Sequence, residues 1–355
     1  MTSCLDDSLK SELKEQMAWG HTVHNKHFHH MYWNDEFDLE GVSFSDCVFE
    51  NVKFSGNCIS SEFSNTVFSE CTFEGFVWRN VNLENCILIN CLFVDVQIDS
   101  LHFDEGKVIN TNWQDCEIED LYFSSSLESI AFTHCMLKTP HFDTLKVTGI
   151  KFIHSSLEQA IMTDFDFKSV QIIDSDFVCL YAMNCTAQDY DFSYMQLKDA
   201  RFSEGNLAGA NFEGSNLEGS CFTESNLVGV NFNRTDLSSA LLINAELSNA
   251  QFIESNLDTT NFSGSIAEAC VFDRAQMYMS DLTQGNFSRS SFIESSLNWT
   301  DFSYSNISDC RFDRAIFEEV EAHAVVDSAT KFFPRIGSIH RTDKDRLKAE
   351  TWLIK

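Results

Sequence analysis

Histidines gather near the N-terminus, where His21, His24, His27, His29 and His30 fall within ten residues. The neutral imidazole ring is a common ligand of zinc and other transition metals, so this cluster is the first candidate for a metal site. The histidines would need an ordered backbone to converge on one ion, and no cysteine or carboxylate stands at ligand spacing beside them. We therefore expect neither a dedicated metal site nor a cofactor.

The 13 cysteines of the chain could form disulfides or bind a metal, but no CxxC pair occurs among them. Nine of them fall at a position where small side chains recur every five residues. These are Cys47, Cys71, Cys86, Cys91, Cys116, Cys135, Cys185, Cys270 and Cys310. Cysteine serves there as a small apolar filler. We expect buried thiols and a reducing, cytoplasmic location, and we leave export by a specialised secretion system open.

Catalytic motifs are missing from the sequence. It contains no Walker-type glycine loop, no serine nucleophile elbow and no HExxH zinc motif. Carboxylates are frequent, but they recur at regular polar positions, and no pair stands out as a general acid and base. The sequence therefore predicts that the protein is not an enzyme.

A five-residue hydrophobic period from Phe44 to Phe317 positions most of these residues. It runs in three registers, 44–59, 63–123 and 127–317, and the later two each start one residue early. We place Ile59 as the last inward residue of the first register. A helix buries residues on a period of 3.6 and a strand on a period of 2, so a fixed five-residue period predicts a solenoid.

Small residues form a second series, two positions before each large one, with Asn or Asp between them, as in Ala210-Asn211-Phe212. This unit resembles the motif A-(D/N)-L-x-x of the pentapeptide-repeat family, over about 275 of the 355 residues. The resemblance implies an all-β solenoid, a right-handed quadrilateral β-helix of about 14 coils with four repeats per coil. The ends would carry short helical or irregular caps.

The residue chemistry agrees with this interpretation. One large and one small inward side chain per repeat would fill a narrow interior, and coils about 4.8 Å apart would make a rod of roughly 65 to 70 Å. Proline removes a backbone donor from such a ladder, and the chain has only two, Pro140 and Pro334. We interpret the aromatic residues at every fourth repeat, such as Phe212 and Phe232, as stacked core rather than as a ligand site.

We expect three segments: an N-terminal helical or irregular cap at 1–40, the repeats at 41–317, and a C-terminal cap or tail with a short helix at 318–355. The N-terminal helix would span 5–18. The open coil ends are sheet edges that the caps would cover, and stacking of coils end to end could give an oligomer. No secretory signal or long apolar run is present, so we expect no membrane span.

The net charge is −30, and residues 41–317 hold 39 acidic and 14 basic residues. This argues against direct nucleic-acid binding and favours a basic partner or simple solubility. One face would carry a run of acids. These are Asp99, Glu117, Glu119, Asp120, Glu158, Asp176, Asp199, Glu218, Asp236 and Asp258. Lys138 and Lys198 interrupt it.

Outward apolar residues suggest contact with something else. Val48, Val67 and Ile87 should lie beside Ile89 and Ile109 in a strip on successive coils. The N-terminal segment could cover this strip, or a partner could. In the tail, Thr342 and Asp345 indicate a helix start. The apolar tail residues that could cap the last coil or dock a partner are Leu347, Trp352, Leu353 and Ile354.

The sequence favours a non-catalytic protein-interaction scaffold or adaptor, with a protein partner of unknown identity. The family resemblance implies an alternative, because its quinolone-resistance and immunity members mimic DNA and bind DNA gyrase or topoisomerase IV. Continuity of acid along one face would distinguish these two functions.

Overall fold

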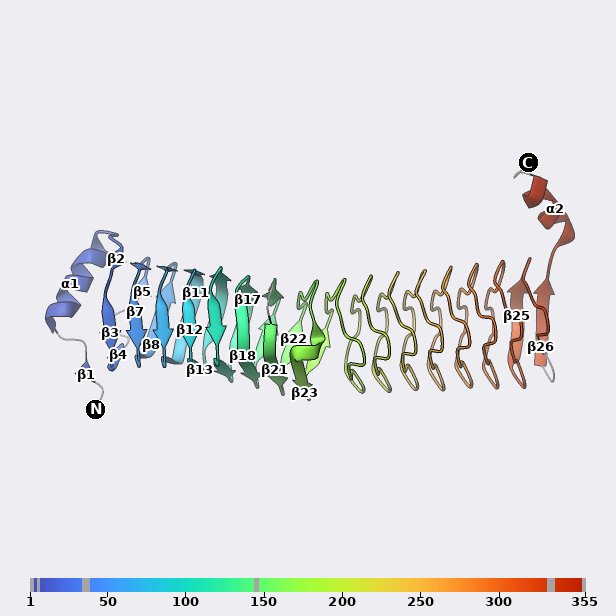
Figure 1. Cartoon of the computed structure of the whole chain (residues 1–355), viewed down its shortest axis with the longest axis horizontal. Helices are drawn as coiled ribbons and strands as arrows, with labels where there is room; N and C mark the ends of the chain where they lie inside the picture. The colour runs from blue at the N-terminus through green and yellow to red at the C-terminus, as the bar shows by residue number, and fades with distance from the viewer. Residues whose placement is uncertain (1–2, 5–6, 34–38, 144–146, 331–335, 353–355) are drawn as a thin grey trace. The chain divides into compact units, whose positions relative to one another are not determined.

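The protein is described here by a computed structural model that covers residues 3–4, 7–33, 39–143, 147–330 and 336–352 (Figure 1). Contacts within the chain divide it into two compact units, Met1–Phe177 and Val178–Lys355. Both are stacks of short turns of parallel backbone, and the predicted β-solenoid is confirmed, with about 15 turns in place of about 14.

Unit 1 contains helix α1 (Asp7–Ala18), which follows the short strand β1, and otherwise consists of short parallel strands. The strands are β1 (Ser3–Cys4), β2 (Val23–His24), β3 (His27–His29), β4 (Met31–Trp33), β5 (Leu39–Glu40), β6 (Ser43–Ser45), β7 (Val48–Glu50), β8 (Lys53–Ile59), β9 (Glu62–Ser64), β10 (Val67–Ser69), β11 (Thr72–Glu84), β12 (Ile87–Ile89), β13 (Leu92–Val94), β14 (Gln97–Asp104), β15 (Lys107–Ile109), β16 (Asn112–Gln114), β17 (Glu117–Phe123), β18 (Ser126–Thr133), β19 (Met136–Lys138), β20 (His141–Phe142), β21 (Val147–Ile153), β22 (Ser156–Glu158), β23 (Val170–Ile173) and β24 (Asp176–Val178). One 3₁₀ turn spans Phe167–Ser169.

Each strand of unit 1 pairs with the strand one turn further along the chain. Val67 pairs with Ile87, and Ile87 pairs with Lys107, so one turn takes four repeats. Corners between strands are residues with φ near +50°, often Asn or Asp, such as Asn65 and Asn85. These two residue types tolerate the left-handed region better than other non-glycine residues.

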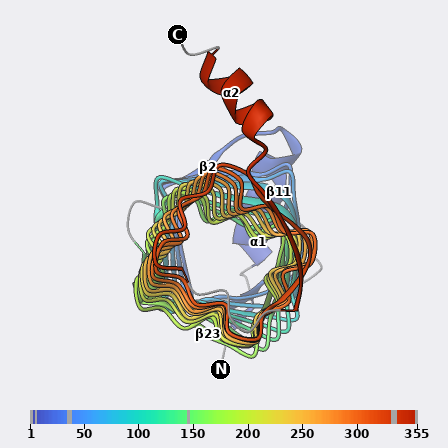
Figure 2. The same ribbon diagram turned by 90° about the vertical axis from the view of Figure 1, so that its right-hand side faces the viewer.

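Unit 2 repeats more regularly, through single bridges such as Asn206 to Asn226 instead of strands. Each repeat closes a tight turn, in which the amide of the small residue donates to the preceding large residue, as from Ala210 N to Leu207 O at 3.0 Å. Glycines at the last repeat position, such as Gly209 with φ +72°, fit the corner as expected. The chain ends with β25 (Ile316–Ala322), β26 (Ile336–Arg341) and helix α2 (Lys344–Trp352). The turns of this unit have a roughly four-sided outline in Figure 2.

Aromatic rings stack along the interior of each unit. In unit 1 the centroids of Phe73, Phe93 and Trp113 lie 4.6 and 4.9 Å apart. In unit 2 those of Phe252, Phe272 and Phe292 are 4.8 Å apart. These separations match the spacing of hydrogen-bonded strands. The interpretation of the aromatic ladder as core is therefore confirmed.

One predicted inward residue is wrong. Cys58 is fully buried and aligns with Leu39 and Trp78, whereas Ile59 is only half-buried. The shortened step thus lies between Phe54 and Cys58, where β8 runs on without a normal corner. The larger aliphatic residue was the natural choice from sequence, but the shortened step decides which side chain faces inward.

The turns of unit 1 also start earlier than residue 41. Val23, Phe28 and Trp33 are buried, and their strands pair with β6, β7 and β8. The first turn is one residue longer than a regular turn, because Val23 pairs with Phe44, whereas four full repeats would pair it with Ser43. A search for a strict five-residue period therefore missed this turn.

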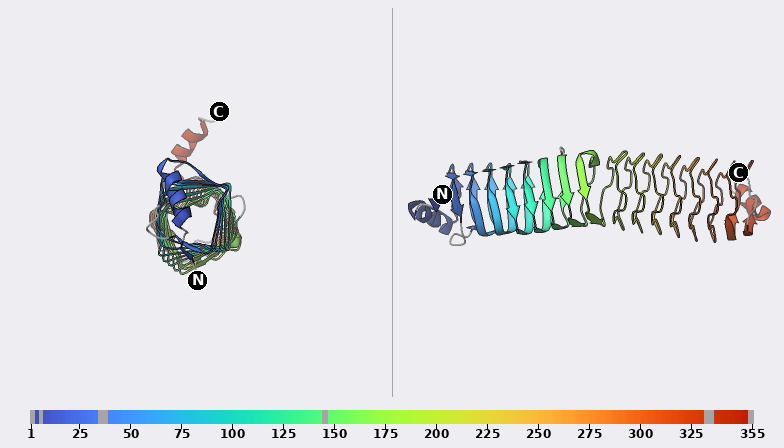
Figure 3. Two further views of the ribbon diagram at one scale, coloured as in Figure 1. Left: turned by 90° about the vertical axis from the view of Figure 1, so that its left-hand side faces the viewer. Right: turned by 90° about the horizontal axis from the view of Figure 1, so that it is seen from below.

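Helix α1 lies against the start of unit 1, next to β2 (Figure 3, left). Leu13 is fully buried, and Lys26 Nζ lies 2.9 Å from Glu12 Oε1. The helix runs over Asp7–Ala18 of the predicted span 5–18, and residues 5 and 6 lie outside the described part. In the tail, Asp343 caps α2 in place of Thr342, because its Oδ1 accepts from the amides of Asp345 and Arg346 at 2.8 and 3.1 Å.

A charge placed in the core should destabilise the solenoid. The Phe232 side chain is fully buried between Phe212 and Phe252. We expect Phe232→Asp to lower the free energy of unfolding by more than about 3 kcal/mol, because the ring stack is lost and a carboxylate is buried without a partner. Urea denaturation followed by circular dichroism measures this. The outward Ser248→Asp serves as control, and equal midpoints for both variants would contradict the inward assignment.

Candidate interaction surfaces

The predicted apolar strip of unit 1 exists as two adjacent rows on the outer face. Val48, Val67 and Ile87 align on β7, β10 and β12, and Ile89 aligns with Ile109 on β12 and β15. All five side chains are half-buried. They therefore lie together, as the sequence predicted, and remain accessible on paired strands.

Polar residues bound this strip at both ends. The first row continues to His27 on one side and Lys107 on the other, and the second row continues from Ile109 to Glu128. Helix α1 packs mainly against β2, which is not one of the strands of the strip. Within the described residues, nothing supports the N-terminal segment as its cover.

The predicted acidic face of unit 1 is not continuous. Asp99 aligns with Glu119, then Lys138, then Glu158, and Asp99 pairs with Arg79 at 3.2 Å. The neighbouring row passes from Glu117 to Met136 and Ser156 before Asp176. Asp120 is exposed at a corner. The acidic residues are thus concentrated on single turns, and Lys138 and Met136 interrupt the two rows between these turns.

In unit 2 two of the predicted acids, Glu218 and Asp258, lie on one row with Ser238 between them, and Asp199 and Asp236 lie on other rows. Glu218 pairs with Lys198 at 2.9 Å. Asp236 Oδ1 accepts from Ser238 N and Asn256 Nδ2, both at 3.0 Å, and Asp258 Oδ1 accepts from Tyr278 N at 2.8 Å. Asp199 is an exposed corner residue. Several of these carboxylates thus help to hold neighbouring turns together.

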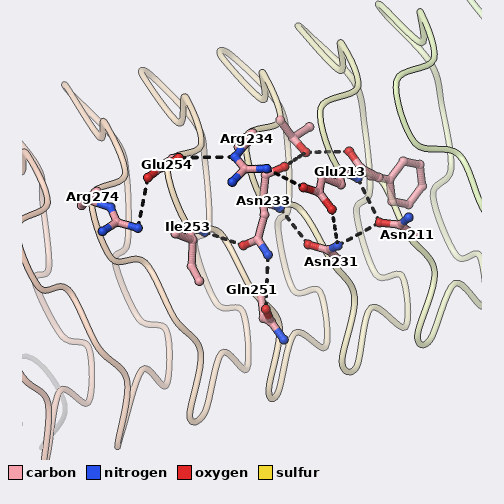
Figure 4. A network of polar contacts seen from close by, with 11 residues as sticks. Asn211, Glu213, Asn231, Asn233, Arg234, Gln251, Ile253, Glu254 and Arg274 are labelled. Carbon is pink, nitrogen blue, oxygen red and sulfur yellow. Dashed lines mark hydrogen bonds and ion pairs between the residues drawn. The ribbon is translucent and has the colours of Figure 1, made fainter.

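Arginine and glutamate alternate along one corner of unit 2. Arg234 bonds Glu213 at 2.8 Å and Glu254 at 3.4 Å, and Arg274 bonds Glu254 at 3.0 Å (Figure 4). Asn231 donates to Asn211 at 2.9 Å in the same network. Exposed ion pairs of this kind contribute little individually to the stability of the fold. Because each of these arginines is paired with a glutamate, the remaining acidic residues leave this surface with a net negative charge.

The histidine cluster does not assemble into a metal site. His27 Nε2 lies 3.1 Å from Glu50 Oε2, and the rings of His27, His29 and His30 are side by side with centroids 5.5 and 5.7 Å apart. Over the described ranges, no three His, Cys, Asp or Glu side chains are arranged to hold an ion.

The interior of unit 2 opens into a cavity of about 310 Å³ at its last turns. Phe302, Phe312, Phe317 and Val320 line its wall, and Arg341 lies at its edge. Ile339 of β26 also lines it, so the cavity lies between the last core rings and the final strand.

Two models of one family match the sequence. The pentapeptide repeat region model matches residues 150–232, and the model of pentapeptide repeats in eight copies matches 61–96, 231–266 and 280–318. Together they cover more than half of the chain. The chain belongs to the pentapeptide-repeat family. No curated protein matches it.

Other pentapeptide-repeat proteins of known structure resemble this chain at low similarity. HetL, involved in heterocyst differentiation regulation in the cyanobacterium Nostoc sp. strain PCC 7120, is 16% identical with a TM-score of 0.33, over 54% of this chain and 92% of HetL. Full-length QnrB1, a plasmid-mediated fluoroquinolone resistance protein, is 17% identical with a TM-score of 0.24, over 62% and 96%. A thylakoid-lumen protein of Arabidopsis thaliana is 21% identical with a TM-score of 0.24, over 32% and 65%.

This pentapeptide-repeat protein also holds its C-terminal helix by a side-chain cluster that the sequence did not reveal. His323 is 2% exposed. Its Nδ1 accepts from Asp343 N at 3.2 Å and its Nε2 lies 3.2 Å from Glu350 Oε2. Glu350 Oε1 also accepts from Tyr304 OH at 2.7 Å and Arg346 Nε at 2.8 Å. A lone histidine and a glutamate well apart in the sequence carry no pattern that would join them.

Of the predicted tail contacts, Leu347 is half-buried in α2. Leu353 and Ile354 lie outside the described residues, as does the side chain of Trp352. No helix in the described part is long and apolar enough to cross a membrane.

Acid should loosen the attachment of α2. The hydrogen bond from Tyr304, then that from Arg346, lowers the pKa of Glu350 to about 2. A carboxylate whose pKa is lowered by folding stabilises the folded state at pH values above its ordinary pKa near 4.5. This stabilisation is lost as the pH falls towards 2. We expect hydrogen exchange of 343–352, corrected for intrinsic rates, to increase between pH 5 and 3. Glu350→Gln should exchange fast throughout, whereas Asp345→Asn should follow the wild type. An unchanged profile for Glu350→Gln would contradict this.

Thiol labelling should separate two cysteines from the buried ones. Burial raises the pKa of Cys58, Cys185 and Cys270 to about 12. Cys221 is only partly covered; burial raises its pKa, but hydrogen bonds with Ser203 and Thr223 outweigh this and lower it.

We expect N-ethylmaleimide at pH 7 to modify Cys221 first and Cys179, which is also half-buried, next. The buried thiols should react only after unfolding, as peptide mass spectrometry would show. Native labelling of Cys58 at the rate of Cys221 would refute the packing.

Proposed function

We propose that this pentapeptide-repeat protein is a non-catalytic scaffold that binds another protein through the apolar strip of unit 1. The observation that carries the proposal is the alignment of five outward aliphatic side chains on paired strands, Val48, Val67, Ile87, Ile89 and Ile109. The fold needs only polar residues at such positions. Five accessible aliphatics in two rows therefore require another explanation, and contact with a partner supplies it.

The strip suits binding for two physical reasons. Its backbone is already fixed by hydrogen bonds on both sides, such as Val67 N to Cys47 O at 3.0 Å, so little ordering is required on association. Its β-branched side chains lose little rotamer freedom when they are covered. The partner would present an apolar surface with a basic rim, because the chain carries a net charge of −30.

Chemistry on a substrate fits the structure less well. Several carboxylates are engaged in pairs and turn contacts, such as Asp99 with Arg79 and Asp236 with Asn256. The titratable cluster of His323 and Glu350 holds a helix of the same chain. We therefore propose a protein that is not an enzyme, acts without a cofactor, and functions in a reducing cytoplasmic compartment.

The second candidate is a DNA-mimicking binder of DNA gyrase or topoisomerase IV. The excess of acid favours it, since a basic DNA-binding surface would attract this chain. The interruptions at Met136, Lys138 and the Lys198–Glu218 pair weigh against it, because a DNA mimic needs charge repeated at regular spacing. Direct binding of nucleic acid is disfavoured by the same charge.

A capture experiment tests the scaffold. Tagged full-length protein, an Ile87→Ser/Ile109→Ser variant and an Ile173→Ser control, whose residue is 44% exposed outside the strip, would be incubated with bacterial lysate. We expect a partner retained by wild type and control but reduced at least about tenfold by the strip variant, because both aliphatics lose apolar burial. Circular dichroism would verify the fold.

Equal retention by all three proteins would reject the strip as the binding site. Retention of gyrase or topoisomerase IV that survives the strip variant but is lost in Glu117→Gln/Glu119→Gln would support the second candidate instead.

A further inference from the structure

Unit 2 exposes three large side chains that its fold does not require. Tyr278, Met279 and Trp299 are 45, 53 and 52% exposed. Met279 and Trp299 are corner residues with φ of +55° and +64°. The same corner of earlier turns carries Gly219 and Ser239. A bulky side chain is uncommon in the left-handed region, so a thioether and an indole on consecutive turns point to a purpose other than packing.

The three side chains form one patch. Met279 N donates to Asn298 O at 3.0 Å, so the turn that contains Tyr278 and Met279 lies directly beside the turn of Trp299. Tyr278 precedes Met279 in the chain. An aromatic ring, a thioether and an indole thus share one edge of two adjacent turns, and we name this group the 278–299 patch.

Carboxylates surround the 278–299 patch. Asp258 lies beside Tyr278, whose amide donates to its Oδ1 at 2.8 Å. Glu318 lies on the next turn beyond Trp299, where its carbonyl accepts from Trp299 N at 2.7 Å. Around the corner, Asp281 pairs in register with Asp301.

These four acids differ from the glutamates of the alternating corner. Arg234 and Arg274 are neutralised by Glu213 and Glu254, whereas Asp258, Asp281, Asp301 and Glu318 form no salt bridge with any residue in the described part of the chain. The charge around the patch is therefore negative and uncompensated, which selects a cationic occupant.

We propose that the 278–299 patch is a docking site for a basic, extended peptide segment of a partner protein. An arginine or lysine of that segment stacks on the Trp299 indole, since cations are attracted to the face of an aromatic ring. Its charged end reaches the surrounding carboxylates, and its methylene stem packs on Met279 and Tyr278. Arginine suits the site best, because its planar guanidinium both stacks and bonds carboxylates.

This site lies in unit 2 and uses residues that the apolar strip of unit 1 does not contain. It rests on the proposed function only in so far as both assign the protein to binding other proteins. A peptide probe reports on this site alone, so its failure leaves the strip untouched, and failure of the capture experiment leaves this site testable.

Binding would be measured by fluorescence anisotropy of a fluorescein-labelled eight-residue peptide of alternating Arg and Ser, at physiological salt, with a Glu/Ser peptide as charge control. The full-length protein would be compared with Trp299→Ala, Trp299→Phe, and Asp258→Asn/Glu318→Gln. Asparagine can keep the contact of residue 258 with the Tyr278 amide. Matched controls are Tyr194→Ala, a corner aromatic that is 72% exposed, and Glu204→Gln/Glu224→Gln, which removes the same charge from exposed corners.

We expect Trp299→Ala and the double acid variant each to weaken Arg/Ser peptide binding at least about threefold, within the range of exposed cation–π and ion pairs. Trp299→Phe should retain much of the affinity, and both controls should match the wild type. The proposal is overturned if the Arg/Ser peptide does not bind. It is equally overturned if the Glu204→Gln/Glu224→Gln control weakens binding as much as the patch variants, which would indicate general attraction to an acidic chain.

Discussion

Backbone hydrogen bonds between successive turns are the constraint on which everything else depends. They fix the turns at the spacing of paired strands, and every side chain then has a copy of its position one turn away. Inside, this spacing equals the stacking distance of aromatic rings, so Phe252, Phe272 and Phe292 stack at 4.8 Å. Outside, it aligns Val48 with Val67 and Arg234 with Glu254. The same turn-to-turn spacing therefore determines the alignment of side chains both in the core and on the surface.

The five-residue period was sufficient to predict the fold, because each repeat contributes one large inward residue. It failed where a turn departs from four full repeats. The long first turn from Val23 and the short step to Cys58 both break the period, and only strand pairing reveals them. The apolar strip was predictable, since position in the repeat determines which side chains face outward. Its function was not, because exposure does not name a partner.

Two further features, the contact of His323 with Glu350 and the exposed Trp299, had little or no signal in the amino-acid sequence. The contact of His323 with Glu350 depends on how the last turns and α2 meet, which no short-range pattern encodes. Trp299 did carry a signal, since earlier turns have Gly219 and Ser239 at the same corner. Its meaning depended on the carboxylates of neighbouring turns, and these come together only when the sequence is folded at four repeats per turn.

The uniform step of the turns has a consequence for how such a chain can change. Insertion or deletion of one whole turn within the regular part of unit 2 returns every side chain to an equivalent environment, because each turn contacts only its neighbours. The chain can therefore vary in length without redesign of its interior. A surface patch that occupies only two turns, such as the one at Trp299, can be gained, moved or lost independently of the rest of the surface.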